Sequence, residues 1–245
     1  MGRTRDVSKI LTSNTSILTL ASASATYAPV AAGGLVLLGT TVVTAQSAAS
    51  LNNIFTSTYD KYMIGLTLII PSTISNTGGS ASIATNGTVS FTSASAISLN
   101  DVFSATYQNY VISVSFSGTA GAYLGLRLRV GGADASGSNY TWGFVAVGTG
   151  GSSFVLTGAG VTSANISRFQ NNAASISSAI FTVFRPFDAD RTAYHGTSFY
   201  DDGATVAPAA AIGGQHGLQT SYTGFTLIPA SGNVTGTISV YGYNK

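Results

Sequence analysis

The chain has 245 residues, enough for one large or two modest domains with a substantial core. Only 7% of its residues are charged, against about a quarter in typical domains, and it contains neither Glu nor Cys. The net charge of +2 without clustered Lys or Arg argues against nucleic-acid binding, and the absence of Cys excludes disulfides and thiolate metal sites.

Neither a targeting signal nor a membrane span is expected. Residues 10–25 are interrupted by Ser, Thr and Asn, unlike the continuous apolar core of a secretory signal. No charge occurs between Lys9 and Asp60. A long stretch without charge would suit a membrane span, but no window there reaches about 18 continuous apolar residues. We therefore expect no membrane insertion.

Residues 1–34 have the composition of an extended arm. Three of the ten basic residues fall within the first nine positions, and the Ser/Ala/Thr-rich stretch 12–26 follows them. Such a stretch cannot bury enough apolar surface to order itself. We expect the arm to be held by something outside it, and assembly with other chains is the simplest explanation.

A fifteen-residue motif occurs twice, at residues 50–64 and again 48 positions later at residues 98–112. Eight of the fifteen pairs are identical, including one Leu, one Phe and two Tyr at fixed offsets. Self-similarity at a fixed period marks a repeated supersecondary unit. We interpret the motif as a strand-joining corner pinned by buried aromatic residues. These are Phe55, Tyr59 and Tyr62 in the first copy, and Phe103, Tyr107 and Tyr110 in the second.

Residues 35–86 predict a small β unit that contains the first copy of the motif. Strand signals occur at residues 35–45 and 63–70, and apolar alternation in the second run indicates one strongly buried face. Residues 72–86 are rich in Ser, Thr, Gly and Asn, which is typical of a linker or an exposed loop. The unit is either a small sheet that pairs with other chains or an edge of the main domain.

Residues 87–245 predict the main body. Many short strands separated by Gly-rich turns favour an all-β fold, an antiparallel, jelly-roll-like β-sandwich. The expected strands are residues 88–91, 111–116, 123–130, 142–147, 154–157, 176–184, 192–199, 223–228 and 235–243. The expected turns lie at residues 131–132, 148–151, 213–214 and 231–233.

Alternation is clearest in residues 123–130. The apolar residues there point one way and the basic residues the other. The first set is Leu124, Leu126, Leu128 and Val130, and the second is Arg127 and Arg129.

Two groups of polar residues admit a chemical role. Asp188 with Asp190, and Asp201 with Asp202, have the residue types of two-carboxylate glycoside hydrolysis, although all four lie in turn-like sequence where Asp is common. His195 and His216 are potential metal ligands, but they lack helical spacing and Cys partners. No nucleophile elbow or phosphate-binding loop is present. We therefore expect no enzyme activity, no cofactor and no metal site.

Two polar connections are candidates for contact with a host surface. Tyr140 and Trp142 follow the polar loop 131–139 and could stack on a sugar ring, or else begin a strand and belong to the core. Asp201 and Asp202 supply hydrogen-bonding groups in a second connection. Loops at the ends of a rigid sandwich are its natural contact sites.

The first eleven residues, MGRTRDVSKIL, resemble the N-terminal anchoring segment of tail-fibre-type structural proteins of tailed bacteriophages, notably cyanophage-like ones. The body is similar to β-rich modules of the same proteins, from the motif at residues 98–112 through LRLRVGG at 126–132 to GTISVYG at 236–242. The resemblance implies a virion protein. It also implies an anchoring role for the basic and apolar residues of the arm, namely Arg3, Arg5, Val7, Lys9, Ile10 and Leu11.

Three classes of function remain open. The first is a tail fibre or tail-associated appendage, which would bind other virion proteins and could contact a host surface glycan. The second is a capsid decoration or head-fibre protein, and the third is a glycan-cleaving enzyme or lectin domain. The arm and the scarcity of charge favour assembly of several copies, and the resemblance implies a homotrimer.

Overall fold

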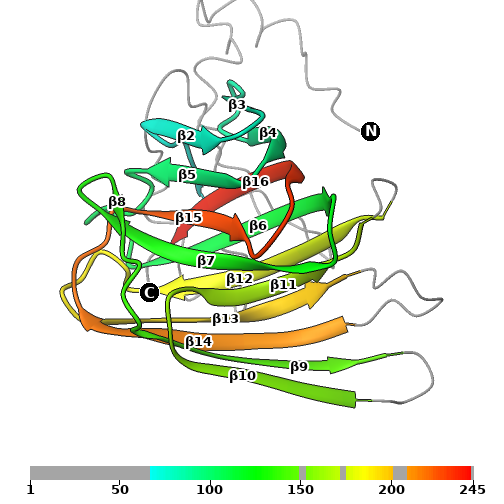
Figure 1. The fold of residues 1–245 in the computed structure, drawn as a ribbon. Helices are drawn as coiled ribbons and strands as arrows, with labels where there is room; N and C mark the ends of the chain where they lie inside the picture. The colour runs from blue at the N-terminus through cyan, green and yellow to red at the C-terminus, as the bar shows by residue number, and fades with distance from the viewer. Residues whose placement is uncertain (1–66, 149–152, 172–174, 201–208, 244–245) are drawn as a thin grey trace, which may run out of the picture. The chain divides into compact units, whose positions relative to one another are not determined.

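The computed structural model describes residues 67–148, 153–171, 175–200 and 209–243, which are built from β-strands without a helix (Figure 1). Leu66–Lys245 forms one compact unit. The expected arm, the first copy of the motif and the predicted strand at residues 35–45 lie outside the described residues.

The larger sheet, sheet A, contains ten strands, and every pairing between them is antiparallel. Nine of them form one hydrogen-bonded path, and β1 pairs with β16 alongside β4. In path order they are β10 (Ser153–Val161), β9 (Tyr140–Val147), β14 (Ala209–Gln219), β13 (Arg191–Phe199), β12 (Ser177–Phe184), β6 (Asn109–Gly118), β16 (Val234–Tyr243), β4 (Val89–Ala94) and β3 (Ser80–Ile83), with β1 at Thr67–Ile69.

The smaller sheet, sheet B, contains six strands and is also antiparallel throughout. Five form its path, and a two-residue strand, β8, pairs with β7. In path order they are β11 (Ala164–Phe169), β7 (Ala122–Val130), β15 (Gly224–Pro229), β5 (Ala96–Asn100) and β2 (Thr73–Thr77), with β8 at Ala133–Asp134.

The two sheets pack as a sandwich, which confirms the predicted fold class. The chain crosses repeatedly between them, with β4, β5, β6 and β7 alternating between sheets A and B, and β14, β15 and β16 doing so again (Figure 1). Such crossings are the jelly-roll-like feature of the fold, because each one places consecutive strands on opposite sides of the core.

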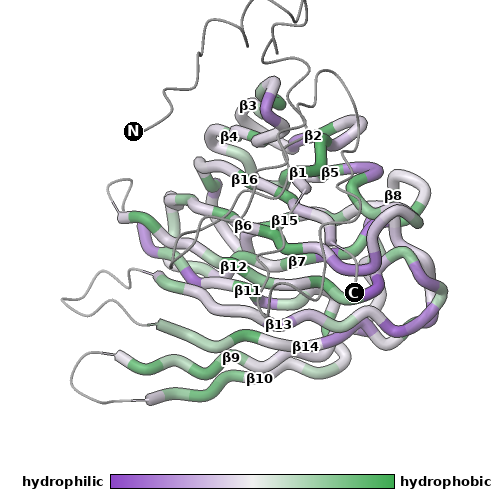
Figure 2. Tube along the Cα trace, turned by 180° about the vertical axis from the view of Figure 1, so that it is seen from behind, coloured by the Kyte–Doolittle hydropathy of each residue, from purple (hydrophilic) through white to green (hydrophobic). Residues whose placement is uncertain are grey.

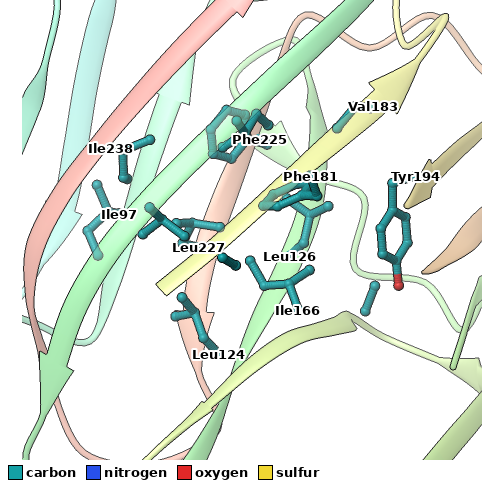
Figure 3. Packing of buried hydrophobic residues seen from close by; sticks show 14 of the residues in the cluster. Ile97, Leu124, Leu126, Ile166, Phe181, Val183, Tyr194, Phe225, Leu227 and Ile238 are labelled. Carbon is teal, nitrogen blue, oxygen red and sulfur yellow. The ribbon is translucent and has the colours of Figure 1, made fainter. Parts of the chain in front are cut away.

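The core lies between the sheets and draws on both (Figure 3). Residues on alternate strand positions point inward, so each strand contributes a row of buried apolar side chains. The labelled side chains from sheet B are Ile97, Leu124, Leu126, Ile166, Phe225 and Leu227, and those from sheet A are Phe181, Val183, Tyr194 and Ile238. All of them are at most 5% exposed.

The second copy of the motif, residues 98–112, is the corner that the sequence predicts. It leaves β5 in sheet B and enters β6 in sheet A. The Tyr110 hydroxyl accepts a hydrogen bond from the Ser104 N–H at 2.7 Å and donates one to the Ser104 carbonyl at 3.0 Å. The Phe103 and Tyr110 rings pack with centroids 4.7 Å apart, and both are buried. Ring packing and hydrogen bonding together fix the path of the connection.

Residues 72–86 are not the linker or loop that their composition predicts. They contain β2, which pairs with β5, and β3, which pairs with β4, separated by a turn at Gly78 and Gly79 with φ of +67° and +55°. Thr and Ser suit an edge strand as well as a loop, so composition alone misleads here. The expected boundary at residue 87 is also wrong, because β1, β2 and β3 belong to the sheets of the body. Of the two alternatives for this region, its described part forms edges of the main domain.

The nine strands predicted in the body all occur, with ends shifted by a few residues. The predicted turn at Gly213–Gly214 is wrong, since both residues lie inside β14. A Cβ on Gly214 would stand 2.2 Å from the Thr141 carbonyl oxygen on β9, so glycine serves close packing of strands at this position.

The predicted faces of two strands need correction. The described part of the run 63–70 is β1, followed by Ile70, whose side chain is 54% exposed instead of buried. On β7 the three leucines are buried as expected, but Val130 is 42% exposed at the end of the strand. Arg129 on the opposite face is only 8% exposed, because it bonds to polar side chains of β5, β8 and β15.

Candidate functional site

The outer face of sheet A has no Asp, Glu, Lys or Arg in three neighbouring rows that cross its seven strands from β10 to β16. The central row consists of Val155, Val145, Ala211, Thr197, Ile180, Ser113 and Ser239. The rows beside it are Ser153, Val147, Ala209, Phe199, Ser178, Ser115 and Thr237, and then Thr157, Gly143, Gly213, His195, Thr182, Val111 and Tyr241. We call these three rows the uncharged face.

Exposed apolar side chains gather on one part of the uncharged face. Five large ones are between 44 and 64% exposed, namely Val145, Val147, Val155, Ile180 and Phe199. Figure 2 shows hydrophobic segments side by side on β9, β10 and β14. Single exposed apolar residues are ordinary on a monomer, whereas a contiguous group marks a surface that meets something else.

Strand β10 borders this face and is an end strand of sheet A. Nine residues long, it contains no charged residue and no Pro. Soluble proteins usually guard an exposed strand edge with Lys, Pro or a bulge, because unpaired backbone groups recruit other strands. The one irregularity in its pairing with β9 lies near its end, between Ala159 and Val161, and the rest of the edge has no such guard.

The outer face of sheet B is polar and centres on Arg129. The guanidinium donates to Asn100 Oδ1 at 3.0 Å, to Ser98 Oγ at 3.1 Å and to Thr226 Oγ1 at 2.9 Å. It also pairs with the Asp134 carboxylate on β8. A buried guanidinium requires this many partners, and the result is that β8 is fixed against β7, β15 and β5.

A shallow hollow of about 180 Å³ lies beside Arg127 on the same outer face. It is lined by residues of β7, β11 and β15 and of their connections: Tyr123, Gly125, Arg127, Ser163, Asn165, Ile228, Pro229 and Ala230. Arg127 Nε donates to the Thr162 carbonyl at 3.0 Å, which holds the guanidinium at the rim. A guanidinium, an amide and a hydroxyl around an aromatic ring can hold a small group that carries carboxylate or hydroxyl oxygens.

The prediction that Tyr140 contacts a receptor is wrong. Its side chain is 1% exposed, and its hydroxyl accepts from the Leu128 N–H at 2.8 Å and donates to the Ala135 carbonyl at 2.9 Å. Burial raises the pKa of this hydroxyl well above its ordinary value. The alternative interpretation, a core residue at the start of a strand, is confirmed.

Of the other predicted contact residues, the structure describes Trp142 but neither Asp201 nor Asp202. Trp142 is partly buried against the core, and its indole covers Gly158 on β10, where a Cβ would stand 2.3 Å from the indole nitrogen. It is therefore held by packing along the edge of the sandwich and does not project from a loop.

Asp188 and Asp190, the described carboxylates of the glycoside-hydrolysis alternative, stabilise a turn. Asp188 Oδ2 lies 2.8 Å from Arg185 Nε, and Asp190 Oδ2 lies 3.2 Å from Arg185 Nη1. Asp190 Oδ1 also accepts a hydrogen bond from the backbone N–H of Arg191 at 2.8 Å. Both side chains thus hold the connection between β12 and β13.

The two histidines cannot share a metal ion. His195 lies on the outer face of sheet A and is exposed, whereas His216 points into the core and is 1% exposed. His216 Nδ1 lies 2.8 Å from the Tyr222 hydroxyl, and its ring packs edge-on against Tyr140. Its Nε2 meets no hydrogen-bonding group among the described residues.

Burial of His216 predicts a loss of stability in mild acid. Burial lowers the pKa of His216 in the folded protein, whereas in the unfolded chain it titrates near its ordinary value of about 6.5. Below that pH the unfolded chain binds a proton that the folded protein does not, so the free energy of unfolding falls as pH falls, by at most about 1.4 kcal/mol per pH unit.

The measurement is urea unfolding between pH 7.5 and 5. His216→Gln should flatten the profile in this window, because Gln does not titrate. His195→Gln, which changes an exposed ring on the outer face, should keep the wild-type slope. A wild-type slope in His216→Gln would contradict the assignment.

The predicted anchoring residues, Arg3 to Leu11, lie outside the described residues. Within the described ranges, no helix has the length and apolar character to cross a membrane, and no group of three or more potential metal ligands is found. The fold and its surfaces thus define an antiparallel β-sandwich in which sheet A carries the uncharged face and sheet B has a polar outer face. Neither a family model, nor a curated protein, nor a solved structure matches the chain.

Proposed function

We propose that this chain is a structural protein of a bacteriophage virion, a tail fibre or tail-associated appendage that assembles as a homotrimer with other virion proteins. The observation that carries the proposal is the contrast between the two outer faces of the sandwich. An uncharged face with exposed Val, Ile and Phe is suited to burial in an assembly, and a polar face is suited to water.

The arm supports the same function. Residues 1–34 are rich in Ser, Ala and Thr and have three basic residues among the first nine, a composition suited to binding another protein. Their resemblance to anchoring segments of tail-fibre-type proteins supports a virion protein as that partner. We place the host-facing surface on the polar face, where the hollow beside Arg127 offers a recess for an oxygen-rich group such as a glycan.

Deleting residues 1–34 is expected to remove the protein from virions while leaving a folded, soluble body. The described residues of the body form a core of their own, with 34 buried apolar residues. The readouts are quantitative mass spectrometry of particles from a phage that encodes the deletion, and thermal unfolding of the purified variant. Normal incorporation would contradict the anchoring role.

Copy number in wild-type particles separates the proposed position from the capsid alternative. A tail appendage is present in few copies, whereas a decoration protein follows the capsid lattice. Immunogold labelling with an antibody against the body should therefore mark the tail. Absence from particles altogether would overturn the proposed function.

A further inference from the structure

We infer that the uncharged face is a self-association surface, buried against another copy of this chain. This inference rests on the assembly of several copies proposed above and names the surface that they use. The face draws on seven strands of one continuous sheet, so its side chains are held in fixed positions before any partner arrives.

The charge pattern identifies a second copy as the occupant. When three copies meet around a closed axis, one part of the face on each copy contacts a different part of the face on its neighbour, so any charge on one part must find its opposite on the other. A surface with no charge meets this condition without leaving an ion unpaired. The nine charged residues of the described body lie outside these three rows. They are Arg127, Arg129, Asp134 and Arg168 on sheet B, Asp101 in the corner after β5, Arg185, Asp188 and Asp190 in the turn after β12, and Arg191 at the start of β13, on the outer side of sheet A beyond the row of His195.

The size of the face matches what a stable association needs. Seven strands about 4.8 Å apart and three rows about 6.6 Å apart cover roughly 34 Å by 20 Å, or about 700 Å². Specific protein interfaces bury about 600 to 1,000 Å² on each partner. The face therefore suffices without help from the polar side of the sandwich.

The edge of the sheet gives an independent indication. A strand such as β10, without charge or Pro, would recruit strands indiscriminately if it stayed open to solvent. A second copy that packs on the uncharged face also lies close to the β10 edge, because Val155 belongs both to β10 and to the central row. Strand β10 thus lacks charge and Pro at the edge that a neighbouring copy would cover.

Val145→Lys tests the inference, with Val130→Lys as the matched control. Both valines are exposed to a similar extent, 45% and 42%, but Val145 is in the central row of the uncharged face and Val130 ends β7 in sheet B. The full chain is measured at 1 to 50 μM, a range of about 50-fold, by native mass spectrometry and by light scattering after size exclusion. Val145→Lys should weaken association by at least about 100-fold, because it buries an unpaired ammonium in each copy.

Wild-type protein and Val130→Lys should both remain associated, while Val145→Lys dissociates and keeps its circular dichroism spectrum. If Val145→Lys unfolds, Thr197→Lys in the same row provides the test, since Thr197 is exposed and lies on the outer side of β13. Association unchanged in a folded face variant would overturn the inference and leave the virion role intact. A monomeric wild type would overturn both the inference and the homotrimer, while incorporation into particles would still test the virion role separately.

Discussion

Replacing Arg129 with Met should lower the free energy of unfolding by roughly 3 kcal/mol, because it leaves the Asp134 carboxylate without its buried partner. The change also removes donors from Asn100 and Ser98. The loss falls at the lower end of the range for a broken buried pair, since the Asp134 side chain keeps 23% of its surface exposed to water. Urea unfolding at neutral pH gives the measurement.

A paired substitution separates loss of the ion pair from loss of packing. Arg129→Met with Asp134→Leu removes both charges at once, so no carboxylate is left unpaired. This double variant should regain part of the stability lost in Arg129→Met. If Asp134→Leu lowered the free energy of unfolding by the same amount in Arg129→Met as in the wild type, the two side chains would not be coupled.

Leu99→Ala should cost about 2 to 5 kcal/mol of unfolding free energy, the usual range for truncating a buried leucine. Leu99 is fully buried on β5, opposite Phe225 on one side and Ile74 on the other. It is also the leucine of the repeated motif. A domain has only about 5 to 15 kcal/mol of stability in total, so this one change at the corner should be visible as a large shift in the urea midpoint.

Leu218→Ala is the matched control. Leu218 is 47% exposed near the end of β14, so its truncation should cost less than about 1 kcal/mol. Equal losses in the two variants would mean that the motif leucine does not belong to the core. That result would remove the physical basis for interpreting the motif as a packed corner.

Local pattern was sufficient for the strands that have one buried face. Alternation in residues 123–130 is a direct consequence of the two-residue period of a strand, so the sequence alone predicts that Leu124, Leu126 and Leu128 face the core. The motif at 98–112 was also recognisable, because aromatic residues at fixed offsets indicate packing at a corner. These features depend on neighbours within a few residues along the chain.

Strands made of small or polar residues were harder to predict. Residues 73–77, 80–83 and 209–219 have compositions that suit turns as well as strands, and only pairing with distant partners makes them strands. Tyr140 illustrates the same limit within the candidate site. Its sequence neighbours are polar, yet the hairpin that contains β8 carries Ala135 and Leu128 to its hydroxyl.

By itself the sequence determined an all-β chain, poor in charge, with a packed corner and an N-terminal stretch whose composition differs from that of the body. Only the tertiary structure decided that its uncharged residues form one continuous face. The reason is strand order, because the face is joined by the pairings of β9 with β14, β12 with β6 and β6 with β16, strands that lie far apart in the chain. Each strand also contributes only alternate residues to that face. The signal was present as uncharged alternate positions in each strand, but pairing between strands was needed to join those positions into a surface.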